Sequence, residues 1–300
     1  ESCYDKALRI SHPDSANGSL DNAPILLRKA SARTLARQLK GTSSIFQEGI
    51  ALLEAQRSEM TEEHATAWHN LAHQYAEQGE HARAVLIWER VLNYRHKMYG
   101  ERYPNYLTTL CNYGQALAGL GKLKQAEKCL RRCFALSLKI HGEHHSSFSH
   151  ICYVLAYNLK RLDNLTEAAF LYRRALDIDR ELMGEDHPDI TASLHNLGQV
   201  YISLGDFDQA EQVCHEAVRL DRNRGGDRDP NYGYSLAGLS RCLEKQERFS
   251  ESCDLLGLAL DILREGLGVD HPDVIYLEEK YFYLKILKEQ EKEITAKIRQ

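Results

Sequence analysis

The sequence has few of the residues and runs that mark membrane, fibrous or disulfide-rich proteins. No apolar run approaches the roughly 20 residues that a membrane-spanning helix needs, and only 6 of the 300 residues are proline. Lys and Arg number 38 against 43 Asp and Glu, so the net charge of −5 is too small to indicate a nucleic-acid-binding surface. We therefore expect a folded chain that neither inserts into a membrane nor binds nucleic acid.

The cysteines and the first residues bear on the compartment. The 8 cysteines form no Cys-x-x-Cys pair, which is typical of free thiols in a reducing environment. The opening residues, Glu1 to Asp5, lack the charged and then apolar profile of a secretion signal. These two features predict a cytoplasmic protein.

A repeat of 42 residues organises most of the sequence. Five glycines follow one another at this spacing: Gly100, Gly142, Gly184, Gly226 and Gly268. Four alanines keep the same spacing at another phase: Ala84, Ala126, Ala168 and Ala210. A third phase is kept by Pro104, Pro188, Pro230 and Pro272, with Ser146 in the one missing place. Three phases held over several periods without an insertion indicate a repeat protein.

Each period has the pattern of two helices joined by a turn. In residues 188–205, Pro188 suits the first turn of a helix, Leu194 and Leu197 lie at helical spacing, and Gly205 ends the helix. A second helix follows with apolar residues on one stripe. The apolar faces are too large for one hairpin to bury, so neighbouring hairpins must stack.

The residues at fixed places in each unit resemble the tetratricopeptide repeat (TPR). In the first clear unit they are Trp68, Leu71-Ala72, Tyr75, Gly79, Ala84 and Trp88. The linkers Gly184-Glu-Asp-His-Pro188 and Gly268-Val-Asp-His-Pro272 are similar to those of the longer, 42-residue repeats of kinesin light chains. The resemblance implies an all-α, right-handed superhelix (solenoid) of TPR helix-turn-helix hairpins.

The repeat also predicts the domain organisation. Residues 61–274 hold five 42-residue units, and residues 275–300 form a C-terminal capping helix and a polar tail. Residues 1–60 form degenerate upstream TPR-like hairpins, with Arg33 and Arg37 where apolar residues belong. Since Cys3 to Ile10 parallels Leu171 to Ile178 inside a second helix, we expect the chain to be part of a larger protein.

In a stack of such hairpins the first helices line the concave surface, which makes their polar residues candidates for a peptide-binding groove. The predicted groove residues are Asn70, His73, Asn112, Gln115, Tyr153, Tyr157, Arg161, Asn196, Gln199 and Arg241. An Asn amide offers a donor and an acceptor together, so Asn70, Asn112 and Asn196 could pair with a peptide backbone. The resemblance to kinesin light chains implies that they clamp a cargo peptide. The alternative is that they bridge adjacent helices or face solvent.

One cluster predicts the chemistry of the ligand. Tyr153, Tyr157, Lys160, Arg161 and Arg241 would suit a ligand with an apolar anchor and an acidic group. The alternative is that the tyrosines pack against the next hairpin.

No motif indicates catalysis, a cofactor or a metal site. The sequence has no phosphate-binding loop, and its clustered histidines lack Cys or carboxylate partners at ligand spacing. We therefore predict a non-enzymatic scaffold or adaptor whose partner is a protein or peptide in the groove. The alternative is a ligand-sensing or autoinhibitory TPR arm of a larger multidomain regulator of the signalling-NTPase type.

Overall fold

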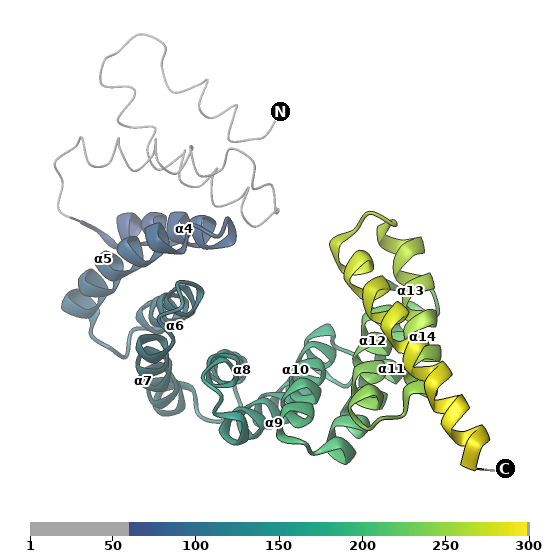
Figure 1. Ribbon diagram of the computed structural model, residues 1–300. Coiled ribbons are helices and arrows are strands. Elements are labelled where there is room, and N and C mark those ends of the chain that lie inside the picture. Colours follow the sequence, from purple (N-terminus) through teal and green to yellow (C-terminus); the bar gives the residue numbers. More distant parts are fainter. Residues whose placement is uncertain (1–59, 299–300) are drawn as a thin grey trace, which may run out of the picture. The chain divides into compact units, whose positions relative to one another are not determined.

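The structure is a computed structural model that describes residues 60–298, with side chains described as far as Glu291 (Figure 1). All regular structure in this range is helical. The first helices of the hairpins are α4 (Glu62–Glu77), α6 (Pro104–Gly119), α8 (Ser146–Arg161), α10 (Pro188–Leu204) and α12 (Pro230–Lys245). The second helices are α5 (His81–Tyr99), α7 (Leu123–His141), α9 (Leu165–Met183), α11 (Phe207–Gly225) and α13 (Phe249–Leu267). A last helix, α14, spans Pro272–Ile298.

The helices begin and end where the repeat pattern places them. Proline opens α6, α10 and α12, where its missing N–H costs no hydrogen bond. The turn inside a hairpin needs one residue with positive φ, and Gly205 supplies it at 76°. Asp163 and Glu247 take the same backbone conformation at the equivalent places, with φ of 63° and 61°. The turn therefore recurs at the same position of the 42-residue repeat even where another residue replaces glycine.

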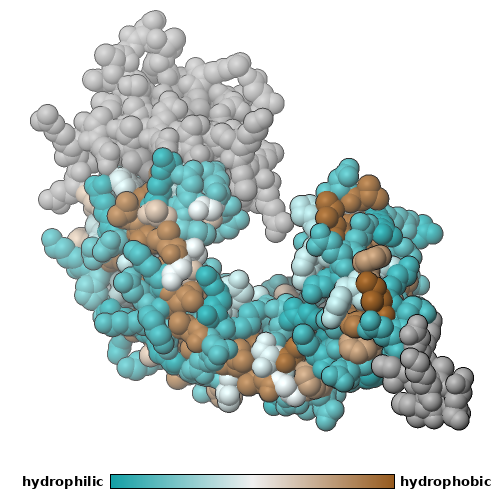
Figure 2. All heavy atoms as spheres, viewed as in Figure 1, coloured by the Kyte–Doolittle hydropathy of each residue, from teal (hydrophilic) through white to brown (hydrophobic). Residues whose placement is uncertain are grey.

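Small residues let the two helices of a hairpin approach closely. A Cβ added to Gly114 would lie 2.9 Å from the side chain of buried Leu130, so α6 and α7 touch at this point. In the last hairpin Ser240 replaces the glycine and hydrogen-bonds to Ser252 with 2.9 Å between their hydroxyl oxygens. Hydrophilic side chains cover most of the visible surface of the described helices (Figure 2).

The chain forms two compact units that divide between Ile140 and His141. In the second unit each of the second helices α9 and α11 packs against its own first helix and against the next one. Successive first helices of this unit also touch, α8 with α10 and α10 with α12. Polar side chains on neighbouring first helices can therefore meet.

Two regions bear on the predicted ends. The predicted hairpins of residues 1–59 lie outside the described residues. The polar segment after Lys288, expected as a tail, continues α14 to Ile298. Among residues 60–298 no helix is both long and apolar enough to cross a bilayer.

Candidate ligand-binding site

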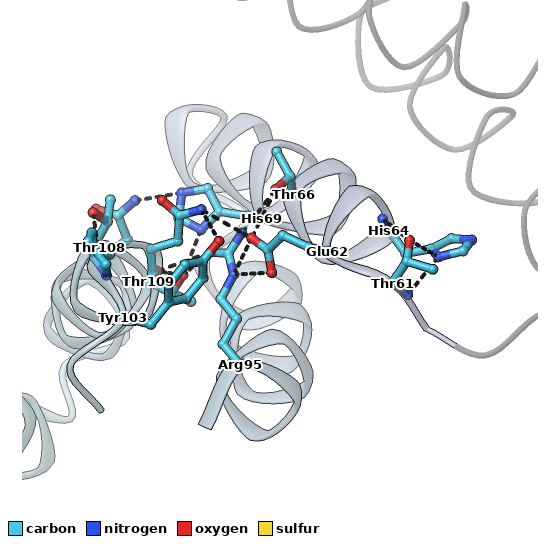
Figure 3. Close-up of polar contacts among 12 residues, drawn as sticks. Thr61, Glu62, His64, Thr66, His69, Arg95, Tyr103, Thr108 and Thr109 are labelled. Atoms are coloured by element: carbon cyan, nitrogen blue, oxygen red, sulfur yellow. Dashed lines mark hydrogen bonds and ion pairs between the residues drawn. The ribbon is translucent and has the colours of Figure 1, made fainter. Parts of the chain in front are cut away.

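In the first unit a polar network links three helices around Arg95 of α5 (Figure 3). The side chain is only 2% exposed. Its guanidinium donates to Glu62 Oε1 of α4 at 2.7 Å, to Thr109 Oγ1 of α6 at 2.6 Å and to the Asn105 carbonyl at 3.1 Å. Because buried charge is costly unless it is paired and hydrogen-bonded, these contacts fix α4, α5 and α6 against one another.

The network reaches one of the predicted groove residues, Asn112, through His69. His69 Nδ1 lies 3.1 Å from Thr109 Oγ1, and Asn112 Nδ2 lies 3.3 Å from His69 Nε2. Burial, together with the charge of Arg95 and the neighbouring His73, lowers the pKa of His69 to about 3. A neutral imidazole can donate from Nδ1 to Thr109 and accept at Nε2 from Asn112. Asn112 thus bridges α6 to α4.

The other predicted residues of this unit lie on the same two helices. Asn70 is half-buried on α4 and makes contacts within the chain. Gln115 is half-buried on α6, where its Nε2 lies 3.6 Å from Cys111 Sγ. His73 has a buried Nδ1 without a hydrogen-bond partner among the described residues. These positions are on first helices, as the pattern predicted.

In the second unit, most of the predicted residues come together around Lys160 of α8. Its Nζ donates to Asn196 Oδ1 at 2.8 Å and to Gln199 Oε1 at 3.2 Å, both on α10. Asn196 Nδ2 donates to the Tyr153 hydroxyl at 2.8 Å. Lys160 Nζ also lies 5.1 Å from the centre of the Tyr157 ring. We call these five residues and Arg241 of α12 the Lys160 cluster.

The Lys160 cluster is positively charged. Burial, and then the repulsion from nearby Arg241, lower the pKa of Lys160. The hydrogen bonds of Lys160 all go to neutral amides, and neither cation forms an ion pair with a carboxylate within residues 60–291. Two adjacent cations without an acidic partner attract an anionic group.

The two tyrosines of the cluster differ in their surroundings. Tyr153 packs edge-on against buried Tyr172 of α9 with 5.4 Å between ring centres. The ring of Tyr153 therefore packs within its own hairpin, and its hydroxyl contacts the next hairpin through Asn196. Tyr157 is exposed beside Lys160, and Arg161 is exposed at the last residue of α8.

Asn112 and Asn196 bridge neighbouring helices, which is the alternative to a peptide clamp. Asn196 donates to Tyr153 and to the Ala192 carbonyl, and its oxygen accepts from Lys160. Its amide is therefore used mainly to position Lys160. Asn112 is bonded through its nitrogen to His69, and its carbonyl oxygen has no hydrogen-bond partner among the described residues.

Sequence reasoning missed a buried polar position in the second helices. Four residues at 42-residue spacing occupy it and all are buried: Arg95, Ser137, Asp179 and Asp221. Asp221 Oδ2 accepts from Ser235 Oγ at 2.5 Å, and Ser235 Oγ lies 2.6 Å from His195 Nε2. Asp221, Ser235 and His195 occupy the same positions of the repeat as Arg95, Thr109 and His69 in the first unit. The buried charge is negative here and positive there. The signal was a polar residue recurring inside an otherwise apolar stripe.

No group of three or more His, Cys, Asp or Glu residues in the described part of the chain is arranged to hold a metal ion. The cysteines of this part form no disulfide.

The comparisons with known proteins agree with this architecture. A tetratricopeptide repeat model matches residues 63–139, 151–223 and 189–265. The chain belongs to the tetratricopeptide repeat family. No curated protein sequence matches it.

Solved structures show the same TPR fold. A putative kinesin light chain of Podosopora anserina with nearly identical TPR-like repeats is 22% identical, with a TM-score of 0.63 over 67% of this chain and 96% of that one. BtubC (BKLC) from P. vanneervenii is 20% identical, with a TM-score of 0.61 over 86% and 95%. A Rap protein complexed with competence and sporulation factor is 12% identical, with a TM-score of 0.60 over 96% and 80%.

These findings confirm the predicted all-α solenoid of TPR hairpins and its resemblance to kinesin light chain-type repeats. TPR solenoids are typically scaffolds for protein–protein interaction rather than enzymes, because their stacked repeats present extended binding surfaces.

Proposed function

We propose that this TPR protein is a scaffold or adaptor that binds a partner peptide along its first helices, with an acidic group of the peptide at the Lys160 cluster. The observation that carries the proposal is Lys160, which lies beside exposed Tyr157 and is repelled by nearby Arg241, while neither cation forms an ion pair with a carboxylate within residues 60–291.

The cluster has the properties of a preorganised anion site. Asn196 and Gln199 hold the Lys160 ammonium group in place, so a ligand need not order it. Lys160 is half-buried, which reduces the screening of its charge by solvent and salt. An incoming carboxylate or phosphate would relieve the repulsion between Lys160 and Arg241.

A peptide would need further anchors, because ordering a flexible segment costs about 2–5 kcal/mol. Tyr157 offers an aromatic surface for an apolar side chain. In the first unit, Asn112 offers a carbonyl oxygen to a peptide N–H. Asn70, His73, Gln115 and Arg161 complete the proposed set.

The same residues would serve a sensing or autoinhibitory arm if the bound segment belonged to the same polypeptide. We also propose a cytoplasmic location, which the lack of disulfides among the described residues supports, since a reducing compartment prevents thiols from forming disulfides.

Selection from a library of displayed peptides, using the whole chain as bait, tests the proposal. We expect enrichment of peptides that combine Asp, Glu or phosphorylated residues with an aromatic or large apolar residue. For a selected peptide, Lys160→Gln or Arg241→Gln should each raise the dissociation constant about tenfold, since a hydrogen bond to a charged group contributes about 1.5–3 kcal/mol.

Arg219→Gln is the matched control. Arg219 is exposed on second helix α11 and has no ion pair or hydrogen bond within the described residues. Its replacement removes the same charge and should leave the dissociation constant unchanged. Enrichment of neutral or basic peptides, or equal loss in all three variants, would contradict the proposal. A selected sequence that occurs elsewhere in the same polypeptide would favour the sensing arm.

A further inference from the structure

One position of the repeat aligns three side chains of the Lys160 cluster. Tyr157, Gln199 and Arg241 follow one another at 42-residue spacing on α8, α10 and α12. These three first helices touch in that order (Figure 1). Since equivalent residues of stacked repeats lie at equivalent places, the three side chains form a row across the helices. All three are exposed, so a ligand can reach the whole row.

The charged and amide groups that remain available along this row are hydrogen-bond donors. Lys160 uses two of its three N–H donors on Asn196 and Gln199. The Gln199 oxygen accepts from Lys160, and its NH2 group has no partner within residues 60–291. The Arg241 guanidinium makes no hydrogen bond or ion pair with these residues either. Donors from three helices, two of them cationic, are therefore open to a group that accepts.

A glycine leaves open space beside the row. Gly238 lies one helical turn before Arg241 and 42 residues after Asn196. At that position of the preceding hairpin, the Asn196 amide reaches across to Tyr153 of α8. A Cβ added to Gly238 would meet no atom within 4 Å. The asparagine bridge is therefore missing between α10 and α12, and the space that it would fill adjoins Arg241.

We propose that the Lys160 cluster binds a phosphorylated side chain of the partner peptide, with the phosphate group in the open space at Gly238. This inference rests on the proposed function and names the acidic group that binds. A phosphate monoester carries about −1.5 to −2 charges at pH 7 and three acceptor oxygens, whereas a carboxylate carries a single charge and two oxygens.

The phosphate group matches the cluster in charge and in shape. Its second charge pairs with the second cation, and its tetrahedral oxygens can accept from donors on three helices at once. The fork of the Arg241 guanidinium can bind two of these oxygens while Lys160 binds the third. Exposed Tyr157 offers an apolar contact that a phosphate ion alone cannot use, so the phosphate belongs to a larger ligand.

Three synthetic peptide libraries test the proposal on the whole chain. Their central residue is phosphoserine, glutamate or serine, and the flanking residues are random. The immobilised chain should retain about ten times more of the phosphoserine library than of the glutamate library, because only phosphate engages both cations fully. Inorganic phosphate at the same molar concentration should not displace the phosphoserine library. Equal retention of these two libraries, or displacement by inorganic phosphate, would overturn the proposal.

Two variants test the geometry. Arg241→Gln should reduce the preference for phosphoserine over glutamate to about twofold or less. Gly238→Leu fills the open space and should lower retention of the phosphoserine library about tenfold, while its unfolding midpoint in urea should not fall. Gln212→Leu, at an exposed site on α11, is the control and should leave retention unchanged. An unchanged preference in Arg241→Gln, or unchanged retention in Gly238→Leu, would contradict the assigned site.

The libraries also separate a failure of this inference from a failure of the proposed function. Suppose that the glutamate and phosphoserine libraries are retained equally and that Lys160→Gln releases both. The site for an acidic peptide then stands, and only the phosphate preference is wrong. If neither is retained above the serine library, or if Arg219→Gln releases them as Lys160→Gln does, both proposals are wrong.

Discussion

Replacing Arg95 by Met should destabilise the first hairpin by about 2 kcal/mol, because the variant removes the positive charge that pairs with Glu62. Met has a similar length, so the cost comes from lost hydrogen bonds rather than from a cavity. Breaking a fully buried ion pair costs roughly 3–5 kcal/mol. The expected loss is smaller here because Glu62 is 24% exposed and can be hydrated once Arg95 is gone.

The reciprocal variant shows whether the two residues act as a pair. Glu62→Gln leaves the 2% exposed guanidinium without an anionic partner, and should also cost about 2 kcal/mol. The double variant should be no less stable than either single variant, since it carries no unpaired buried charge. This corresponds to a coupling energy of about 2 kcal/mol between the two positions.

Tryptophan fluorescence in urea measures this locally. The chain has only 2 tryptophans, and both Trp68 and Trp88 lie in the first hairpin, on α4 and α5. Arg83→Gln is the control, because Arg83 pairs with Glu80 at an exposed site where an ion pair contributes about 0–1 kcal/mol. Additive effects of Arg95→Met and Glu62→Gln, or a loss no larger than that of Arg83→Gln, would refute the reasoning.

The remaining predictions concern the pH dependence due to His69 and the packing at Gly238 and Gly114. The pKa of His69 is about 3 in the folded chain and near 6.5 when unfolded, so the unfolded state binds the proton first and stability should fall as the pH drops below about 6.5 toward 3. His69→Gln should flatten this dependence in urea titrations followed by tryptophan fluorescence at pH 7 and pH 5; an unchanged slope would count against a buried neutral imidazole. Gly238→Ala should raise the free energy of unfolding by about 0.5–1 kcal/mol, because an added Cβ meets nothing within 4 Å and alanine is the better helix former. Gly114→Val should lower the free energy of unfolding by about 1–3 kcal/mol, because the larger side chain overpacks against Leu130. Circular dichroism in urea measures the free energy of unfolding of both variants. If both substitutions changed it in the same direction, the reasoning would be contradicted.

The repeat pattern alone was enough to predict the hairpins and their turns. Successive residues fix a helix through local hydrogen bonds, capping and apolar spacing, so Pro188, Gly205 and the apolar positions between them mark α10 in the sequence. The constant period also identifies the turns at Asp163 and Glu247, where glycine is missing. The same period put every candidate residue on a first helix.

The tertiary structure decided what those residues touch. A single sequence shows that Asn112 and Asn196 share a position in the repeat. It does not show that the Asn112 amide hydrogen-bonds to His69, or that the Asn196 amide hydrogen-bonds to Lys160 and Tyr153. Such partners come from a neighbouring hairpin some 40 residues away, and side-chain length and burial select them. Arg95 is the clearest case: its sequence neighbours give no sign of burial, which arises only where α4 and α6 enclose it and Glu62 and Thr109 satisfy its hydrogen bonds.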